Sequence, residues 1–158
     1  MIKVEKQSKI FPKRLTLIPN VPEQIYVEGN LQLLNSAGIA VIGTRNPSNY
    51  GKRMCKAFTK ELVKYGVTII SGMAKGIDTI AHKTCLENGG RTIAVLPCGF
   101  EKIYPKENER VFKDIINFKG TAITEYSRNE KAESKKFLER NRIVSRTCNR
   151  NISNRSRI

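Results

Sequence analysis

The stretch Ser71–Asp78, S-G-M-A-K-G-I-D, combines residue types that suit the binding of an anion. Gly72 and Gly76 would let a phosphate or sugar approach the main chain, and a strand that turns into a helix presents N–H groups and a helix dipole. Lys75 adds a mobile positive charge, and Asp78 would cap a helix or bind a ribose. The spacing matches neither a Walker A loop nor G-x-G-x-x-G. Two interpretations stay open: an anion site, or an ordinary turn that needs glycine for its backbone angles.

No set of residues predicts catalysis or metal binding. His82 is the only histidine, and its helical neighbourhood favours a locally hydrogen-bonded ring over a catalytic base. Asp78 and Glu125 lack the further acidic residues that a metal site needs. The cysteines are scattered without a C-x-x-C spacing, which favours buried free thiols over zinc; they are Cys55, Cys85, Cys98 and Cys148. The sequence therefore predicts a protein that is not an enzyme and has no metal or cofactor.

The elements that must position these residues alternate between strands and helices. Apolar runs that end at glycine or a polar turn predict buried parallel strands; they cover 39–43, 67–70, 91–96 and 121–125. Helical periodicity follows each strand; the helices cover 48–65, 77–88, a segment around 111–118, and 137–145. In the first helix, Met54, Phe58, Leu62 and Tyr65 would face the core. The pattern predicts an α/β fold, a Rossmann-like parallel sheet with helices on both faces.

Three loops follow strands of this predicted sheet, and they span 44–51, 71–78 and 97–108. Ligands of parallel α/β sheets bind beyond the carboxyl ends of the strands. The three loops would therefore bring Arg45, Lys75 and Lys106 together with several glycine N–H groups.

The composition indicates a polyanionic partner. The 158 residues include 29 Lys and Arg against 14 Asp and Glu, a net charge of +15, and such an excess is typical of nucleic-acid-binding proteins. No apolar run is long enough to span a membrane, at about 18 residues, and the first residues lack the apolar core of a signal peptide. We expect a cytoplasmic protein with no membrane partner.

Six sequence words resemble the DNA-processing protein A family (DprA, also called Smf). They are I-A-V-I-G-T-R-N-P-S-N-Y-G (39–51), S-G-M-A-K-G-I-D-T-I-A-H (71–82), G-G-R-T-I-A-V-L-P-C-G (89–99), I-Y-P-K-E-N (103–108), T-E-Y (124–126) and F-L-E-R-N-R-I-V-S (137–145). The resemblance covers roughly residues 11–145. It implies a non-catalytic Rossmann-like domain that binds single-stranded DNA in natural transformation and helps load a RecA-type recombinase. Self-association in the family makes a homodimer an expectation.

The resemblance also implies which residues contact DNA. Carried over by position, they are Gly43, Thr44, Arg45, Ser71, Gly72, Lys75, Gly76, Asp78, Lys106, Phe137, Arg140, Asn141 and Arg142. The basic side chains suit phosphates, and Phe137 suits either stacking on a base or packing in the core.

The domain organisation follows from the same comparison. We expect a lead-in over 1–38, the Rossmann-like domain over 39–145, and a basic, disordered tail over 146–158 in place of the family's C-terminal strand. We expect the chain to lack the helical domain that precedes this one in the family and the winged-helix domain that often follows it. The tail has two interpretations: a nucleic-acid-binding extension, or the product of a reading-frame slip near codon 146, which we prefer.

Two other functions remain alternatives to single-stranded DNA binding. The turn at 71–78 would equally suit a Rossmann-like enzyme or sensor for a nucleotide or phosphorylated ribose. A truncated product without activity is the third interpretation.

Overall fold

The computed structural model describes residues 1–147 in full and the backbone of residues 150–154. Its sheet has seven strands in the order β1-β2-β6-β5-β4-β3-β7. The strands are β1 (Ile2–Glu5), β2 (Gln24–Gly29), β3 (Gly38–Gly43), β4 (Thr68–Ser71), β5 (Thr92–Leu96), β6 (Thr121–Thr124) and β7 (Arg150–Asn154). Strands β3 to β7 pair in parallel, whereas β1 and β2 form an antiparallel extension beside β6.

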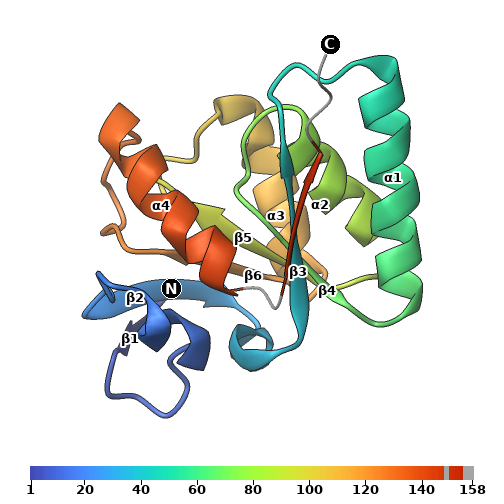
Figure 1. The fold of residues 1–158 in the computed structure, drawn as a ribbon. Helices are drawn as coiled ribbons and strands as arrows, with labels where there is room; N and C mark the ends of the chain where they lie inside the picture. Colours follow the sequence, from blue (N-terminus) through green and yellow to red (C-terminus); the bar gives the residue numbers. More distant parts are fainter. Residues whose placement is uncertain (148–149, 155–158) are drawn as a thin grey trace.

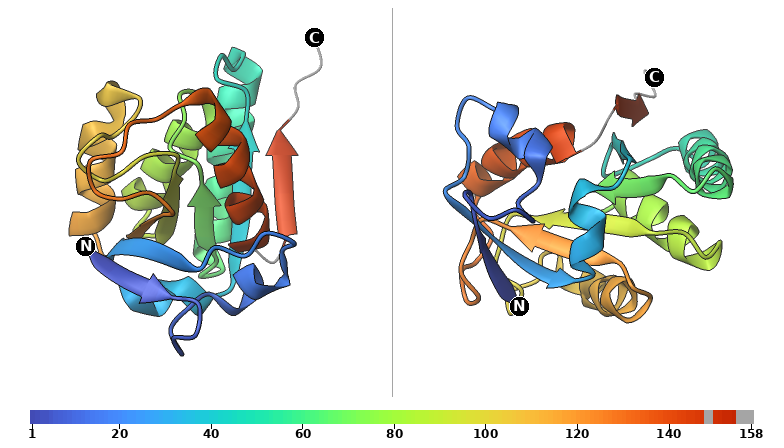
Figure 2. Two further views of the ribbon diagram at one scale, coloured as in Figure 1. Left: turned by 90° about the vertical axis from the view of Figure 1, so that its left-hand side faces the viewer. Right: turned by 90° about the horizontal axis from the view of Figure 1, so that it is seen from below.

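Helices cover both faces of the sheet, as predicted (Figure 1). They are α1 (Asn49–Lys64), α2 (Ile77–Glu87), α3 (Glu109–Asn117) and α4 (Ser134–Thr147), with short 3-10 helices η1 (Lys13–Leu17), η2 (Leu31–Asn35) and η3 (Lys106–Asn108). The first three connect successive parallel strands on one face, and α4 lies on the other beside the N-terminal segment (Figure 2). None of the helices in the described part of the chain is long and apolar enough to cross a membrane.

Alternating residues of each central strand supply the core on the two faces. In β5, Ile93 and Val95 pack on the α4 side, whereas Ala94 and Leu96 pack on the α3 side. All five residues of β5 are buried, as a parallel strand between two helical layers requires. The predicted Rossmann-like class is confirmed.

The C-terminal segment differs from the prediction. Helix α4 continues to Thr147, and Arg150–Asn154 forms β7 in parallel register with β3. The polar sequence argued against a strand buried on both faces, but β7 lies at the edge of the sheet, where a polar strand is tolerated because its backbone pairs on one side only. The segment predicted as a tail in place of the family's strand thus includes a strand at Arg150–Asn154. Residues 148–149 and 155–158 lie outside the described part, as does the predicted thiol of Cys148.

Helix α1 shows a second difference. Its N-cap is Ser48, whose Oγ accepts a hydrogen bond from the N–H of Gly51, and Gly66 ends it with a φ of 70°. The predicted inward positions Phe58 and Tyr65 are 49% and 76% exposed. Small residues instead line the buried face, and the thiol of Cys55 donates to the carbonyl of Ile77 in α2. Phe118, at the end of the helix predicted around 111–118, is 66% exposed and follows the last residue of α3.

The strand β1 was not predicted, because its short, charged sequence has one buried residue, Val4. Three of the predicted free thiols are confirmed as buried and unpaired: Cys55, Cys85 and Cys98.

His82 is fully buried between α2 and the sheet. Its Nδ1 lies 2.7 Å from Oγ1 of Thr92, and that hydroxyl donates to the carbonyl of Ile69 at 2.8 Å. Because the threonine proton is engaged, Nδ1 of His82 must carry the hydrogen and donate it. Burial, aided by the positive charge of Arg140, lowers the pKa of His82 to about 3. The prediction of a locally hydrogen-bonded histidine is confirmed.

The low pKa of His82 predicts acid sensitivity. In the unfolded chain this imidazole takes up a proton near its ordinary pKa of 6.5, whereas the folded protein resists protonation down to about 3. The contribution to stability is therefore complete above about pH 6.5 and falls by about 1.4 kcal/mol for each pH unit below it. Urea unfolding should show a loss of about 2 kcal/mol between pH 6.5 and about pH 5 from this one residue.

His82→Gln is the matched control, because it removes the protein's only imidazole. Its free energy of unfolding should be lower near neutral pH but should lack this component of the slope. An identical pH dependence in both proteins would contradict the assignment.

Candidate nucleic-acid interface

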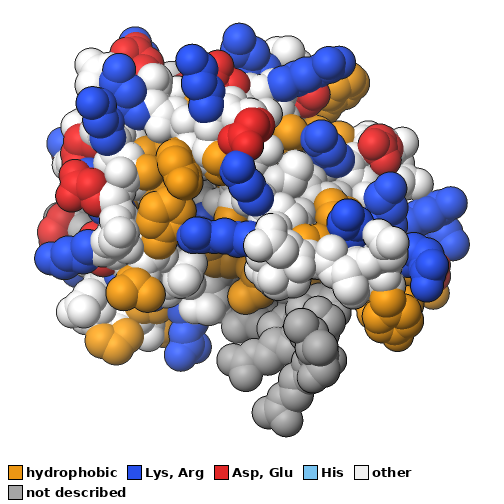
Figure 3. All heavy atoms as spheres, turned by 90° about the horizontal axis from the view of Figure 1, so that it is seen from above, with side chains coloured by type: hydrophobic (Ala, Val, Ile, Leu, Met, Phe, Trp, Pro, Cys, Tyr) orange, Lys and Arg blue, Asp and Glu red, His pale blue; other side chains and the backbone are white. Residues whose placement is uncertain are grey.

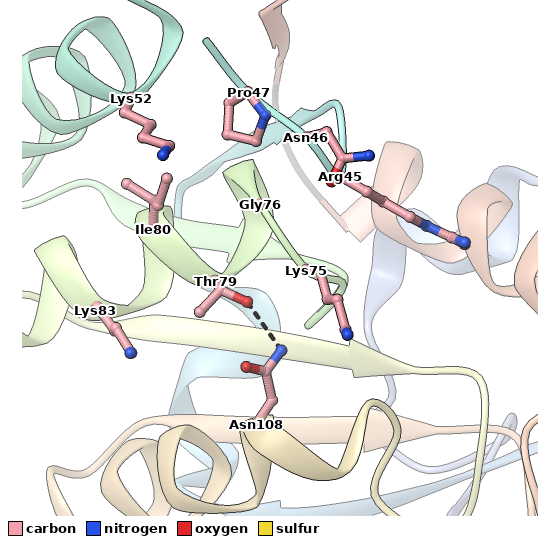
Figure 4. Close-up of a pocket in the computed structure, with 10 residues that line it drawn as sticks. All are labelled: Arg45, Asn46, Pro47, Lys52, Lys75, Gly76, Thr79, Ile80, Lys83 and Asn108. Carbon is pink, nitrogen blue, oxygen red and sulfur yellow. Dashed lines mark hydrogen bonds between the residues drawn. The ribbon is translucent and has the colours of Figure 1, made fainter. Parts of the chain in front are cut away.

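A hollow of about 510 Å³ lies beyond the carboxyl ends of β3 and β4. Its lining residues come from the loops after these strands and from three helices (Figure 4); they are Arg45, Asn46, Pro47, Lys52, Lys75, Gly76, Thr79, Ile80, Lys83 and Asn108. Four of them are cationic and none is acidic. We call this site the cationic hollow. Each of the three predicted loops contributes residues to the lining, among them Arg45 and Lys75, whereas Lys106 is not one of them.

The loop at one wall of the cationic hollow is held by Asp78, which is 5% exposed in the first turn of α2. Its Oδ2 accepts hydrogen bonds from the N–H groups of Gly72 at 3.1 Å and Ala74 at 3.3 Å. The hydroxyl of Thr79 donates to the carbonyl of Ala74 at 2.7 Å. The side-chain amide of Asn108 donates to Thr79 and to the carbonyl of Met73, both at 2.8 Å. The loop is therefore fixed before any ligand arrives.

These bonds decide which backbone donors remain for an anion. The N–H of Gly72 is taken by Asp78, so Gly72 does not cradle a ligand. Within the described chain, the N–H groups of Lys75 and Gly76 donate to no protein group. Gly76 immediately precedes α2 with a φ of 80°, and a Cβ there would lie 2.3 Å from the carbonyl oxygen of Thr44. The backbone donors of the predicted motif that remain available are thus those of Lys75 and Gly76.

Arg140 ties α4 to the same loop from the opposite face of the sheet. Arg140 is 5% exposed, and its Nη1 donates to the carbonyls of Val95, at 2.8 Å, and Gly72. A Cβ on Gly72 would overlap this guanidinium. Burial lowers the pKa of Arg140 and raises that of Asp78, and the attraction between the two charges opposes both shifts. Arg140 and Gly72 therefore act together as internal supports.

An aromatic group borders the cationic hollow. The guanidinium of Arg45 lies over the ring of Phe137, 5.3 Å from its centroid, in cation–π geometry. Tyr104 meets the same ring edge-on at a centroid distance of 5.6 Å and is 49% exposed. These residues line a small cavity of about 40 Å³ together with Lys75. Phe137 is only half-buried, so its ring borders the site and is not enclosed in the core.

Lys75 is partly neutralised by an acidic neighbour. Its Nζ lies 2.5 Å from Oε1 of Glu107, and both side chains are more than half exposed. The hydrogen bond between them raises the pKa of Lys75 and lowers that of Glu107. The adjacent Lys106 is exposed at the start of η3 and is not among the lining residues.

The other predicted site residues are not among those that line the hollow. The hydroxyl of Ser71 donates to the carbonyl of Val41. Gly43 and Thr44 are exposed at the end of β3, and the carbonyl of Thr44 accepts from the N–H of Ile77. Further along α4, Asn141 accepts from Arg140, and Arg142 forms an ion pair with Glu125.

Sequence reasoning missed several residues of the site. Lys52 and Lys83 lie on helices that flank the hollow, and Asn46, Thr79, Asn108 and Tyr104 complete its walls and border. The signal for Thr79 and Lys83 was available, because residues four apart on α2 share one face. Lys52 carried no such signal, because its position depends on how α1 packs beside α2.

The chain is similar in sequence to proteins of a known family. The model of the family described as DNA recombination-mediator protein A matches residues 3–153. Protein Smf from Synechocystis is 40% identical over 139 residues, which are 85% of this chain and 35% of that protein. DNA processing protein DprA from Streptococcus pneumoniae is 38% identical over 138 residues, 87% of this chain and 48% of that protein. The chain thus spans about a third to a half of the length of these curated relatives.

Two solved structures share the fold over 96% of the chain. One is DprA from Streptococcus pneumoniae, with a TM-score of 0.89, 33% identity and 53% of that chain covered. The other is DNA processing protein A from Helicobacter pylori, described for its single-stranded DNA binding mode, with a TM-score of 0.85, 32% identity and 68% of that chain covered. By family model, sequence and fold, the chain belongs to the DNA recombination-mediator protein A family.

Proposed function

We propose that this chain binds single-stranded DNA at the cationic hollow, without catalysis, in DNA processing during transformation and recombination. The observation that carries the proposal is the lining of the hollow. Arg45, Lys52, Lys75 and Lys83 surround it, and no acidic side chain is among the lining residues. Such a site attracts a phosphate backbone and releases its counterions on binding.

The fixed loop supports the same proposal. Backbone N–H groups at the start of a helix of 11 residues bind phosphate without sequence preference. Lys75 and Gly76 supply two such donors, and the bonds to Asp78 hold them in place. The donors need little reordering when a strand binds, which lowers the entropic cost of association.

The aromatic residues at the border of the hollow would contact the bases, whereas the cations bind the phosphates. Bases of a single strand are unpaired and stack on aromatic rings, whereas those of a duplex are enclosed. Phe137 and Tyr104 lie beside the cations that would hold the adjoining phosphates. A base that stacks on Phe137 would take the position now held by the guanidinium of Arg45.

Relatives strengthen the proposal and extend it to partners. The Helicobacter pylori neighbour is described by its single-stranded DNA binding mode, and the family description names recombination mediation. We include a RecA-type recombinase and a second copy of the chain as expected partners on family resemblance. Predicted contacts of Lys106, Asn141 and Arg142 with DNA stay part of the proposal.

Fluorescence anisotropy with a labelled oligothymidylate, beside a matched duplex, tests this function. We expect preference for the single strand and an affinity that falls steeply with salt, by a log–log slope of about 0.7 for each phosphate contact. Equal binding to both forms would contradict the proposal. Thermal stabilisation by a mononucleotide, without any shift from the oligonucleotide, would favour the nucleotide sensor instead.

Arg45→Ala should weaken binding of single strands by at least about tenfold, because a hydrogen bond to a charged group contributes about 1.5–3 kcal/mol. The loss should be similar for all base sequences, since phosphates carry no sequence information.

Two variants control for the total charge of the protein. Lys13→Ala removes one exposed positive charge far from the hollow and should leave the affinity unchanged. Glu107→Gln releases Lys75 from its ion pair and should tighten binding. An Arg45→Ala protein that binds as the wild type does would rule out the hollow as the site.

A further inference from the structure

Helix α1 carries a row of cations that begins at the cationic hollow. Lys52 lines the hollow, and Lys56 and Lys60 follow at intervals of four residues with Arg53 beside them. All four side chains are exposed, and none has an acidic partner among the described residues. Seen from above, Lys and Arg side chains are spread across this face of the molecule, and one group of them lies at the right, the side on which Figure 1 shows α1 (Figure 3).

The other helices do not share this charge pattern. Helix α3 mixes both signs, and the lysines at the start of α4 form ion pairs with Glu130, Glu133 and Glu139. On α1 the one acidic residue is Glu61, which pairs with Lys64 at 2.9 Å beyond the row. Like charges four residues apart destabilise a helix. The row therefore carries a repulsion that a bound polyanion would relieve.

The spacing of the row fits the backbone of an extended single strand. Residues four apart on an α-helix lie about 6 Å apart along its axis, close to the separation of successive phosphates in an unstacked strand. From Lys52 to Lys60 the row extends for about 12 Å. It can thus engage about two phosphates beyond those in the hollow.

We propose that the row Lys52, Lys56 and Lys60 extends the DNA path, so that a strand leaving the cationic hollow continues along α1. The inference rests on the proposed single-stranded DNA binding. It adds the direction in which the bound strand runs and the length of strand that the protein contacts. The hollow and the aromatic border fix a short stretch of the strand, and α1 binds the backbone that follows.

The test compares two double variants with the same net charge. Lys56→Gln/Lys60→Gln removes the outer part of the row, and glutamine keeps a helix propensity close to that of lysine. Lys9→Gln/Lys13→Gln removes two exposed charges from the N-terminal segment, which lies at the opposite end of the molecule from the hollow. Each protein is titrated with oligothymidylates from about 4 to about 20 nucleotides, which span the site sizes of single-strand-binding folds.

For long oligonucleotides we expect the α1 variant to lower the salt slope by about 1.4, at about 0.7 per phosphate. The ratio of wild-type to variant affinity should then change about sevenfold between 50 and 200 mM salt. For the shortest oligonucleotides that bind, the α1 variant should equal the wild type. The N-terminal control should match the wild type at every length.

Three outcomes would overturn the inference. Equal losses in both double variants would show an effect of net charge alone. A loss independent of oligonucleotide length, or as large for duplex as for single strands, would show that α1 does not continue the single-strand path. Failure of the proposed function itself is distinguished because the wild type would then show no single-strand preference at any length.

Discussion

The buried charges of Arg140 and Asp78 are the constraint on which the site depends. Arg140 reaches from α4 across the carboxyl ends of the strands to bind the carbonyls of Gly72 and Val95. Asp78 approaches the same loop from α2 and binds its N–H groups. Charges buried this deeply are costly unless each is hydrogen-bonded and compensated. The backbone of the loop between β4 and α2 forms hydrogen bonds with both charged side chains, and these bonds fix the conformation of the loop.

Within the stretch Ser71–Asp78, some residues hold the loop in place and others line the cationic hollow. Gly72 and Ala74 bond internally to Asp78, whereas Lys75 and Gly76 line the cationic hollow. The hollow is lined by four long cationic side chains, which suits a ligand held by its phosphates. Phe137 connects α4 with the hollow. It belongs to α4, like Arg140, and its ring contacts Arg45 from the loop after β3.

The sequence was informative where the structure depends on local pattern. Apolar runs that end at glycine or a polar turn located the parallel sheet and the three loops, and the helix predicted over 48–65 is found at Asn49–Lys64. The sequence did not reveal which groups the charged side chains bind. Arg140 and Asp78 were predicted to contact DNA, because residue type does not show whether a charge is buried. Phe58 was misplaced because small residues, Cys55 and Thr59, bring α1 close to its neighbours. Strand β7 was not predicted because a strand at the edge of a sheet does not need an apolar sequence.

The most direct measurement is the change in backbone amide NMR shifts when an oligothymidylate is added. Donation of an N–H to a phosphate oxygen perturbs that amide strongly. The account predicts the largest changes at Lys75 and Gly76, with smaller ones in the loop after β3, and little change at Gly72, whose N–H already binds Asp78. Changes that spare Lys75 and Gly76 and cluster between α2 and α3 would contradict it.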